Sequence, residues 1–313
     1  MVLDTGGASI TVAQGPAVQC GAAGAKISGV ALAAADSAGA CVTVERGGAL
    51  ALDSCEVRNT AGDGVQALGE CSLASCKVLE CGAYGVVALD GGLVRTAGTT
   101  IALNTKTGAL ARGKGARIVL GEGTTVEKNK MHGVGVDKGG AVTASKSAIR
   151  ENAYVGVNVG DESTAQLDEC LIHGNALHGI QVTAGKVEVS KSAITKAGKL
   201  GVFVNPPPAQ GAAQPFSASN EQRRAWVRLD RVEVTSCGFF GVHVTGGYLE
   251  AKDVDVLQSG VHLVPQTLAP TRPYPCANLH VHCCATPVRG CSGGRLRWDS
   301  ACVRARDLPA NAS

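Results

Sequence analysis

The stretch Gly156–Val182, GVNVGDESTAQLDECLIHGNALHGIQV, contains one full period of the repeat that decides the fold. It opens and closes on the same pattern, Gly-apolar-x-apolar, first at Gly156 and again 23 residues later at Gly179. Short segments such as Val157–Val159 alternate apolar and polar residues, which is typical of a β-strand with one buried face. Glycine, serine and asparagine separate these segments. The stretch therefore predicts roughly three short strands in each period.

The same pattern recurs along most of the chain. Its copies follow at intervals of 21, 23, 25, 23, 23, 22, 40 and 19 residues, and CVTV at Cys41 precedes the first copy by 23. This period predicts a β-solenoid, in which each coil buries its apolar face against its neighbours. The copies are GVQA at Gly64, GVVA at Gly85, GALA at Gly108, GVGV at Gly133, GVNV at Gly156, GIQV at Gly179, GVFV at Gly201, GVHV at Gly241 and GVHL at Gly260.

Two further columns keep a constant distance from these glycines. Seven residues before each glycine from Gly64 to Gly241 stands a β-branched apolar residue, which suits an inward-facing strand position. Two residues further back most side chains are small, as a narrow stacked interior requires. The β-branched column is Val57, Val78, Ile101, Val126, Ile149, Ile172, Ile194 and Val234, and the small column is Cys55, Cys76, Thr99, Thr124, Ser147, Cys170, Ser192 and Val232. No convincing helix separates the strands, which argues against βαβ units.

An asparagine column follows the β-branched column by three residues in four successive coils. Stacked at ~4.8 Å, such side chains can form a hydrogen-bonded ladder. Asparagine also tolerates the left-handed backbone conformation that a tight turn needs. The predicted ladder consists of Asn104, Asn129, Asn152 and Asn175, with Cys81 and Ala197 at the flanking positions.

These columns resemble the parallel β-helix repeat of the pectate-lyase-like superfold, over residues 24–264. Within that superfold the repeats look most similar to those of F-box-associated and SHC-binding-type β-helix proteins. The resemblance implies an all-β fold, a single-stranded right-handed parallel β-helix of about ten ~23-residue coils with an irregular Cys-rich C-terminal tail. It is specific for architecture and weak for function.

Three boundaries follow from the repeat. Residues 1–23 are expected to form an N-terminal cap or first coil. Residues 24–264 form the β-helix, interrupted at 205–224 by a segment rich in Pro, Ala, Gln and Ser that reads as a protruding loop. This insert is either a recognition loop or a segment without function. Residues 265–313 form a Pro/Cys/Arg-rich tail or cap.

Lyases and hydrolases with this fold place carboxylates and basic residues on one outer sheet face. None of the outward positions of the Gly-apolar-x-apolar strands is a carboxylate. Just beyond three of these strands lie Asp90, Asp137 and Asp161, either as a calcium or catalytic site or as solvated turn residues. The outward positions are Gln66, Val87, Leu110, Gly135, Asn158, Gln181, Phe203, His243 and His262.

Two other groups are candidates for binding. Phe203, His243 and His262 occupy equivalent outward positions on successive copies, so they could contact a sugar or a peptide; chance placement on the surface is the alternative. In the tail, Cys276, His280, His282 and Cys283 are soft ligands close in sequence. No CxxC pair accompanies them, so capping or buried thiols are the alternative to a metal site.

The absence of outward carboxylates on these strands leads to the prediction of a structural, protein-interaction scaffold without catalytic activity. Phosphate- and dinucleotide-binding motifs are lacking, so no cofactor is expected. The net charge of +3 is too small to indicate nucleic acid, and no stretch of ~18 apolar residues indicates a membrane span. The expected partners are therefore other proteins.

The expected compartment is the cytoplasm, because no secretory leader is evident and the thirteen cysteines form an odd number. A cytoskeletal or ciliary assembly, or a ligase adaptor, is compatible with that setting. The alternative function is a carbohydrate-active enzyme or carbohydrate-binding module of the pectate-lyase-like type.

Overall fold

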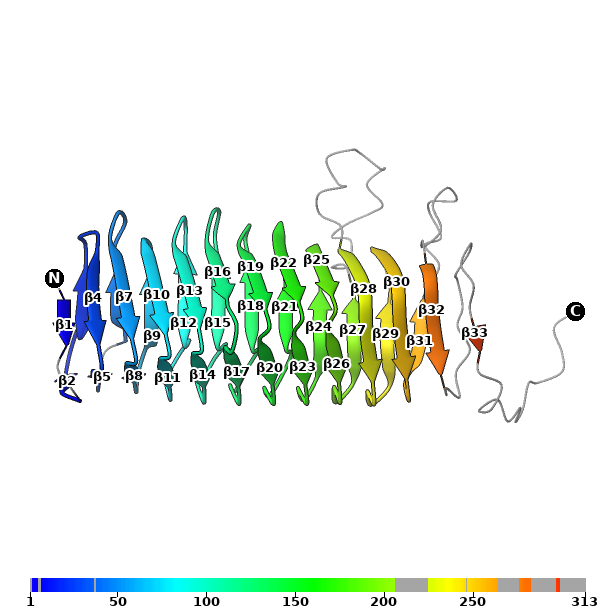
Figure 1. The fold of residues 1–313 in the computed structure, drawn as a ribbon, viewed down its shortest axis with the longest axis horizontal. Helices are drawn as coiled ribbons and strands as arrows, with labels where there is room; N and C mark the ends of the chain where they lie inside the picture. Colours follow the sequence, from blue (N-terminus) through cyan, green and yellow to red (C-terminus); the bar gives the residue numbers. More distant parts are fainter. Residues whose placement is uncertain are drawn as a thin grey trace, which may run out of the picture.

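The computed structural model describes residues 2–4, 7–36, 38–205, 225–245, 247–263, 276–282 and 297–298. All regular elements within these ranges are β-strands, stacked side by side along a rod whose coils follow one another in sequence order (Figure 1). Successive coils pair in parallel and in register. The chain is a right-handed parallel β-helix of about ten turns, which confirms the predicted fold class.

Each coil contributes three strands, and stacking these strands builds the faces of the rod. The first strands are β1 (Val2–Asp4), β4 (Ala25–Ser28), β7 (Ala49–Asp53), β10 (Glu70–Ala74), β13 (Leu93–Ala97), β16 (Arg117–Leu120), β19 (Ala141–Ser145), β22 (Ser163–Asp168) and β25 (Gly185–Ser190). The second strands are β2 (Ser9–Val12), β5 (Ala31–Ala34), β8 (Glu56–Asn59), β11 (Lys77–Leu79), β14 (Thr100–Ala102), β17 (Thr125–Glu127), β20 (Ala148–Arg150), β23 (Leu171–His173) and β26 (Ala193–Thr195).

In the last coils two long strands, β28 (Trp226–Thr235) and β30 (Tyr248–Leu257), supply both the first and the second position. The third strands form a separate eleven-stranded sheet. They are β3 (Val18–Cys20), β6 (Ala40–Val44), β9 (Asp63–Ala67), β12 (Val86–Leu89), β15 (Ala109–Arg112), β18 (Val134–Asp137), β21 (Val157–Val159), β24 (His178–Val182), β27 (Leu200–Val204), β29 (Phe240–Val244) and β31 (Gly260–Leu263).

The core is the narrow interior of the rod. The β-branched column that starts at Val57 points into it, and its eight residues are at most 1% exposed. The small column lies beside it and is buried as well. Glycine stands at or just before the start of the third strands from β9 to β31 because the next coil comes so close: a Cβ on Gly133 would lie 2.6 Å from Ile149 Cγ2 and 2.7 Å from Asn152 Nδ2. Any larger residue there would push two coils apart.

The four asparagines form a buried ladder between the second and third strands. The Nδ2 of Asn104 donates to Asn129 Oδ1 at 2.9 Å, Asn129 donates in the same way to Asn152, and Asn152 to Asn175. The left-handed conformation, however, falls on the residue before each asparagine, for example Lys128 with φ of 54°. The asparagines are therefore needed for their inward amide groups and not for their tolerance of positive φ.

The structure describes most of the predicted first coil, and only parts of the predicted insert and of the segment beyond residue 264. Residues 1–23 contain β1, β2 and β3, which make up the first coil. The insert predicted at 205–224 lies outside the described residues, apart from Asn205. Beyond residue 264 the backbone of β32 (Cys276–His282) pairs in parallel with β30, and β33 (Arg297–Trp298) pairs with β32. Among the described residues no helix is long and apolar enough to cross a membrane.

Candidate functional site

The outward side of the first strands, here called the first-strand face, carries a group of polar and aromatic side chains in its C-terminal half. On β22, β25, β28 and β30 alternate residues point out of the rod, and the register stacks them in three columns. The first column is Thr164, Lys186, Trp226 and Tyr248; the second is Gln166, Glu188, Arg228 and Glu250; the third is Asp168, Ser190, Asp230 and Lys252. Four carboxylates and three cations thus lie around two large aromatic residues.

An aromatic pair occupies the last two positions of the first column. Trp226 and Tyr248 are direct register partners on neighbouring coils, and both are half-buried. The Nζ of Lys186 lies 4.5 Å from the centre of the Trp226 ring, which is a cation–π contact. Register partners in a parallel sheet lie ~4.8 Å apart, so the two aromatic residues are neighbours on this face, here called the Trp226–Tyr248 platform.

Ion pairs hold the second column in place. Glu188 Oε1 lies 2.7 Å from Lys186 Nζ, and Gln166 Nε2 donates to the other carboxylate oxygen at 3.4 Å. The hydrogen bond from Lys186 lowers the pKa of Glu188 below its ordinary value, against a smaller opposing effect of burial. Arg228 Nε lies 3.7 Å from Glu250 Oε1 on the next coil. The carboxylates of Glu188 and Glu250 therefore lie on the coils before and after β28, which carries Arg228.

The third column adds hydroxyl and carboxylate groups at the edge of the face. Ser190 Oγ donates to Asp168 Oδ1 at 2.6 Å. Arg231 Nη2 donates to Asp230 Oδ2 at 3.1 Å, whereas the other oxygen, Oδ1, is buried and has no hydrogen-bond partner among the described residues. A buried acceptor of this kind is uncommon in native proteins and can mark a binding position.

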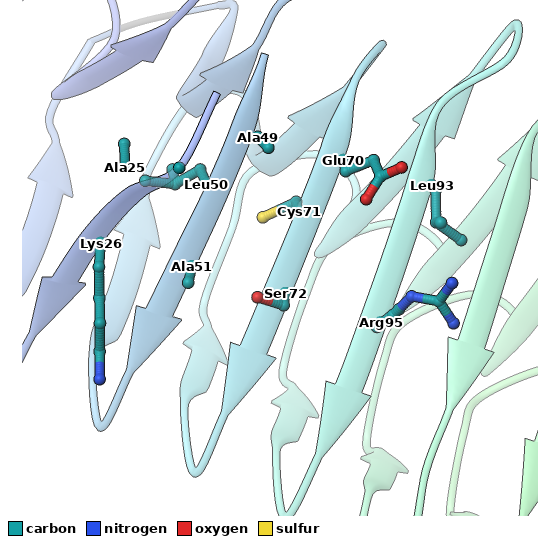
Figure 2. A pocket seen from close by; sticks show the side chains of 11 residues that line it. Ala25, Lys26, Ala49, Leu50, Ala51, Glu70, Cys71, Ser72, Leu93 and Arg95 are labelled. Carbon is teal, nitrogen blue, oxygen red and sulfur yellow. The ribbon is translucent and has the colours of Figure 1, made fainter. Parts of the chain in front are cut away.

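Two hollows lie along the same face. One, of about 230 Å³, lies in front of β19, β22 and β25 and is lined by Gln166, Asp168, Glu188 and Ser190 among others. The second, of about 210 Å³, lies near the N-terminal end, where the small side chains of Ala51 and Ser72 separate Lys26 from Arg95 (Figure 2). From β4 to β30 the face consists of ten first strands, so it extends for about 43 Å at ~4.8 Å per coil.

The predicted binding residues lie on a different surface, the outward side of the third strands, here called the third-strand face. Phe203 and His243 are register partners with ring centres 5.4 Å apart, and His178 packs on the other side of Phe203 at 5.1 Å. The backbone of His262 pairs with that of His243, as the column predicts, and its side chain lies outside the described residues.

The three predicted acidic residues stand at the ends of third strands or in the turns after them. The Asp137 carboxylate lies 3.6 Å from the Arg112 guanidinium, and Asp90 lies against Gly113 in the neighbouring coil. Across the described part of the chain, no group of three or more His, Cys, Asp or Glu could hold a metal ion, so Asp161 does not complete such a site. Among the predicted tail ligands, Cys283 lies outside the described residues, and Cys276, His280 and His282 are described only as backbone of β32.

Sequence reasoning missed the first-strand columns because only the third strands were used to list outward residues. The signal was nevertheless present. The outward first-strand positions lie two, four and six residues before the small column, which places Asp168, Gln166 and Thr164 before Cys170. The same count from Val232 leads to Asp230, Arg228 and Trp226.

Comparisons with known proteins agree with this architecture. The family model described as "Right handed beta helix region" matches residues 63–206. No curated protein matches the sequence. Among solved structures, pectate lyase Pel9A is 15% identical with a TM-score of 0.52, over 83% of this chain and 67% of the other. The periplasmic alginate epimerase AlgG is 13% identical with a TM-score of 0.46, over 77% and 73%. The catalytic domain of a GH87 alpha-1,3-glucanase is 9% identical with a TM-score of 0.30, over 68% and 45%.

These findings correct the predicted function. The prediction of a scaffold without catalytic activity is wrong, because the solved structure that matches with a TM-score above 0.5, pectate lyase Pel9A, is an enzyme. The nearer resemblance to F-box-associated and SHC-binding-type proteins has no support, and neither have protein partners or a cytoskeletal or ciliary setting. At these identities the likeness concerns the fold, and the chain has the right-handed parallel β-helix architecture of pectate-lyase-like proteins.

Proposed function

We propose that this protein is carbohydrate-active, and that it binds an extended glycan along the first-strand face and acts on it beside Glu188 and Glu250. The observation that carries the proposal is the Trp226–Tyr248 pair, set in register among these carboxylates and Arg228. Large aromatic side chains with a polar surround suit a sugar ring, which has an apolar C–H face and a rim of hydroxyl groups.

Binding would use the regular spacing of the face. One sugar ring packs on the Trp226–Tyr248 platform, while its hydroxyl groups meet the charged second column. Hydrogen bonds that involve an ionised partner are about twice as strong as neutral ones, so Glu188 and Arg228 would contribute most of the polar recognition. Neighbouring sugar units would extend over the hollow lined by Gln166 and Asp168.

The two glutamates offer acid–base chemistry. Glu188 and Glu250 are separated by two coil steps, or ~9.6 Å between their backbones, and inverting glycosidases hold their carboxyl groups roughly 6.5–9.5 Å apart. One carboxylate would activate a water molecule while the other protonates the leaving oxygen. Glu188 fits the role of the base because Lys186 lowers its pKa and so keeps it ionised. Hydrolysis with inversion is therefore the reaction that this pair would support.

The proposal is tested with a panel of pectin, alginate and α-1,3-glucan, by affinity electrophoresis and by analysis of the products. We expect retarded migration with at least one polymer and release of reducing ends. Trp226→Ala should weaken binding about tenfold, in line with the loss of an aromatic contact. Glu188→Gln should abolish product release, because the amide cannot act as a base, and should weaken binding only in part, because the aromatic contacts remain.

Lys77→Ala is the matched control, since Lys77 is exposed on β11 of the second strands and far from the proposed site. Products with an unsaturated end would show elimination instead of hydrolysis and would overturn the assigned reaction. If no polymer binds and no product forms, the proposed function is wrong.

The cytoplasmic location stays a prediction. The eight cysteines from Cys20 to Cys237 are all free and buried, which is compatible with a reducing compartment. Fractionation of cells that express the tagged full chain would test this expectation.

A further inference from the structure

A separate cavity opens on the third-strand face, where the outward column passes from Leu110 through Gly135 to Asn158. Because Gly135 has no side chain, it leaves a gap between its two neighbours. The result is a cavity of about 190 Å³, here called the Gly135 cavity. Sites for drug-sized ligands measure roughly 300–1,000 Å³, so this cavity fits a small molecule and not a polymer.

An incompletely paired guanidinium forms one wall. Arg112 ends β15 and Asp137 ends β18, and the two are register partners. Arg112 Nε lies 3.6 Å from Asp137 Oδ2, which is an ionic contact but too long for a good hydrogen bond. This Nε is buried and has no hydrogen-bond partner among the described residues. The Arg112 side chain as a whole is 41% exposed, so the rest of the guanidinium can donate to a ligand in the cavity.

A second polar atom of the cavity is also unpaired. His132 Nδ1 is buried without a hydrogen-bond partner in the described structure, and the edge of the Tyr154 ring packs against the imidazole at 6.0 Å between centres. Burial lowers the pKa of His132, so its imidazole is neutral near pH 7. Two buried polar atoms without partners at the wall of one cavity are a combination that folding alone does not favour, because each destabilises the folded state.

We propose that the Gly135 cavity binds a small organic carboxylate that carries hydroxyl groups. Its carboxylate would accept from the accessible guanidinium nitrogens of Arg112, and a hydroxyl group would pair with Asn158. Tyr84, Leu110 and Met131 also line the cavity and would pack on the carbon skeleton. Asp137 offsets part of the positive charge, which favours a singly charged carboxylate over a phosphate dianion.

This inference does not rest on the proposed glycan function, because the cavity and the first-strand face lie on different sheets. The shared chemistry of carboxylate and hydroxyl occurs in sugar acids and in short hydroxy acids. The test therefore titrates the full chain with glucuronate, lactate, glucose and inorganic phosphate, by calorimetry and by ligand-observed NMR. We expect glucuronate or lactate to bind, and glucose and phosphate to bind at least tenfold more weakly.

Substitutions of cavity residues test whether the carboxylate binds in the Gly135 cavity. Arg112→Gln removes the charge and should weaken carboxylate binding at least tenfold. Gly135→Val should fill the gap with the same result; Gly135→Ala is the milder version, since the new Cβ would meet the flexible end of Leu110 at 3.0 Å. Trp226→Ala should leave carboxylate binding unchanged, so the failure of either proposal can be recognised separately. Equal affinity for glucose and glucuronate, or wild-type affinity in Arg112→Gln, would overturn the inference.

Discussion

Replacing Asn129 by alanine tests whether the ladder holds the coils together. Its side chain makes four hydrogen bonds: Oδ1 accepts from the backbone N–H and from Nδ2 of Asn104, and Nδ2 donates to Ile101 O and Asn152 Oδ1. At about 1 kcal/mol for each bond, with a further cost for buried groups left unpaired, the loss is about 4–6 kcal/mol. That is a large part of the stability of an ordinary domain.

Asn175→Ala is the matched control because Asn175 ends the ladder. Its side chain makes three of these bonds, accepting two from Asn152 and donating one to Ile149 O, so the cost should be about 1 kcal/mol smaller. Urea unfolding gives the free energies, and hydrogen exchange at the Asn104 amide reports the local opening. If Asn129→Ala lowers the unfolding free energy by less than 1 kcal/mol, or if Asn175→Ala costs more, the ladder does not act as described.

Three further outcomes are expected from local features. Lys146 has φ of 47° at a turn position where the two preceding coils have Gly98 and Gly123, so Lys146→Gly should raise the unfolding free energy by about 0.5–1 kcal/mol in urea unfolding. Burial raises the pKa of Cys71 to about 12, so alkylation at pH 8 followed by mass spectrometry should modify it only after unfolding. Burial, with smaller contributions from nearby cations, lowers the pKa of His178 to about 4, against about 6.5 in the unfolded chain. As the pH falls, the unfolded chain takes up the proton before the folded protein does. The contribution of His178 to the unfolding free energy is therefore complete above pH 6.5 and should fall by up to about 3 kcal/mol toward pH 4. Urea unfolding at several pH values measures this, and His178→Phe should remove the pH dependence.

The residues that point into the core could be predicted because every coil requires an apolar side chain of similar size at the same position. A residue that points into the rod packs against the equivalent residues of the coils before and after it. Val57, Ile101 and Ile172 are therefore all β-branched and buried. The register follows from that column, since a shift by one residue would turn every apolar side chain outward. The left-handed residues were not predictable in this way: Lys128 and Glu151 adopt positive φ although their side chains do not favour it, because the ladder next to them fixes the turn.

The residues that point outward show no repeating pattern, because a solvent-exposed position does not require the same type of side chain in successive coils. Trp226 and Glu188 carry no sequence signal of their own, and only counting from the small column shows that they lie on one face. The Gly135 cavity could not be predicted from the sequence. Its glycine was recognised as an outward position, but a missing side chain becomes a binding feature only once Arg112 and His132 are known to border the gap.

The ion pairs of the first-strand face also bear on which glycan it would hold. Lys186 Nζ already lies 2.7 Å from Glu188 Oε1 in the free protein, so a polyanion would have to compete with Glu188 for this cation, and Glu250 would repel it beside Arg228. Neutral hydroxyl groups can instead bridge the existing pairs by replacing water. Such binding releases few counterions, so we expect affinity near Trp226 to change less than threefold between about 50 and 200 mM salt. A loss of tenfold or more over that range would show that the cations themselves, and not the aromatic platform, attract the glycan.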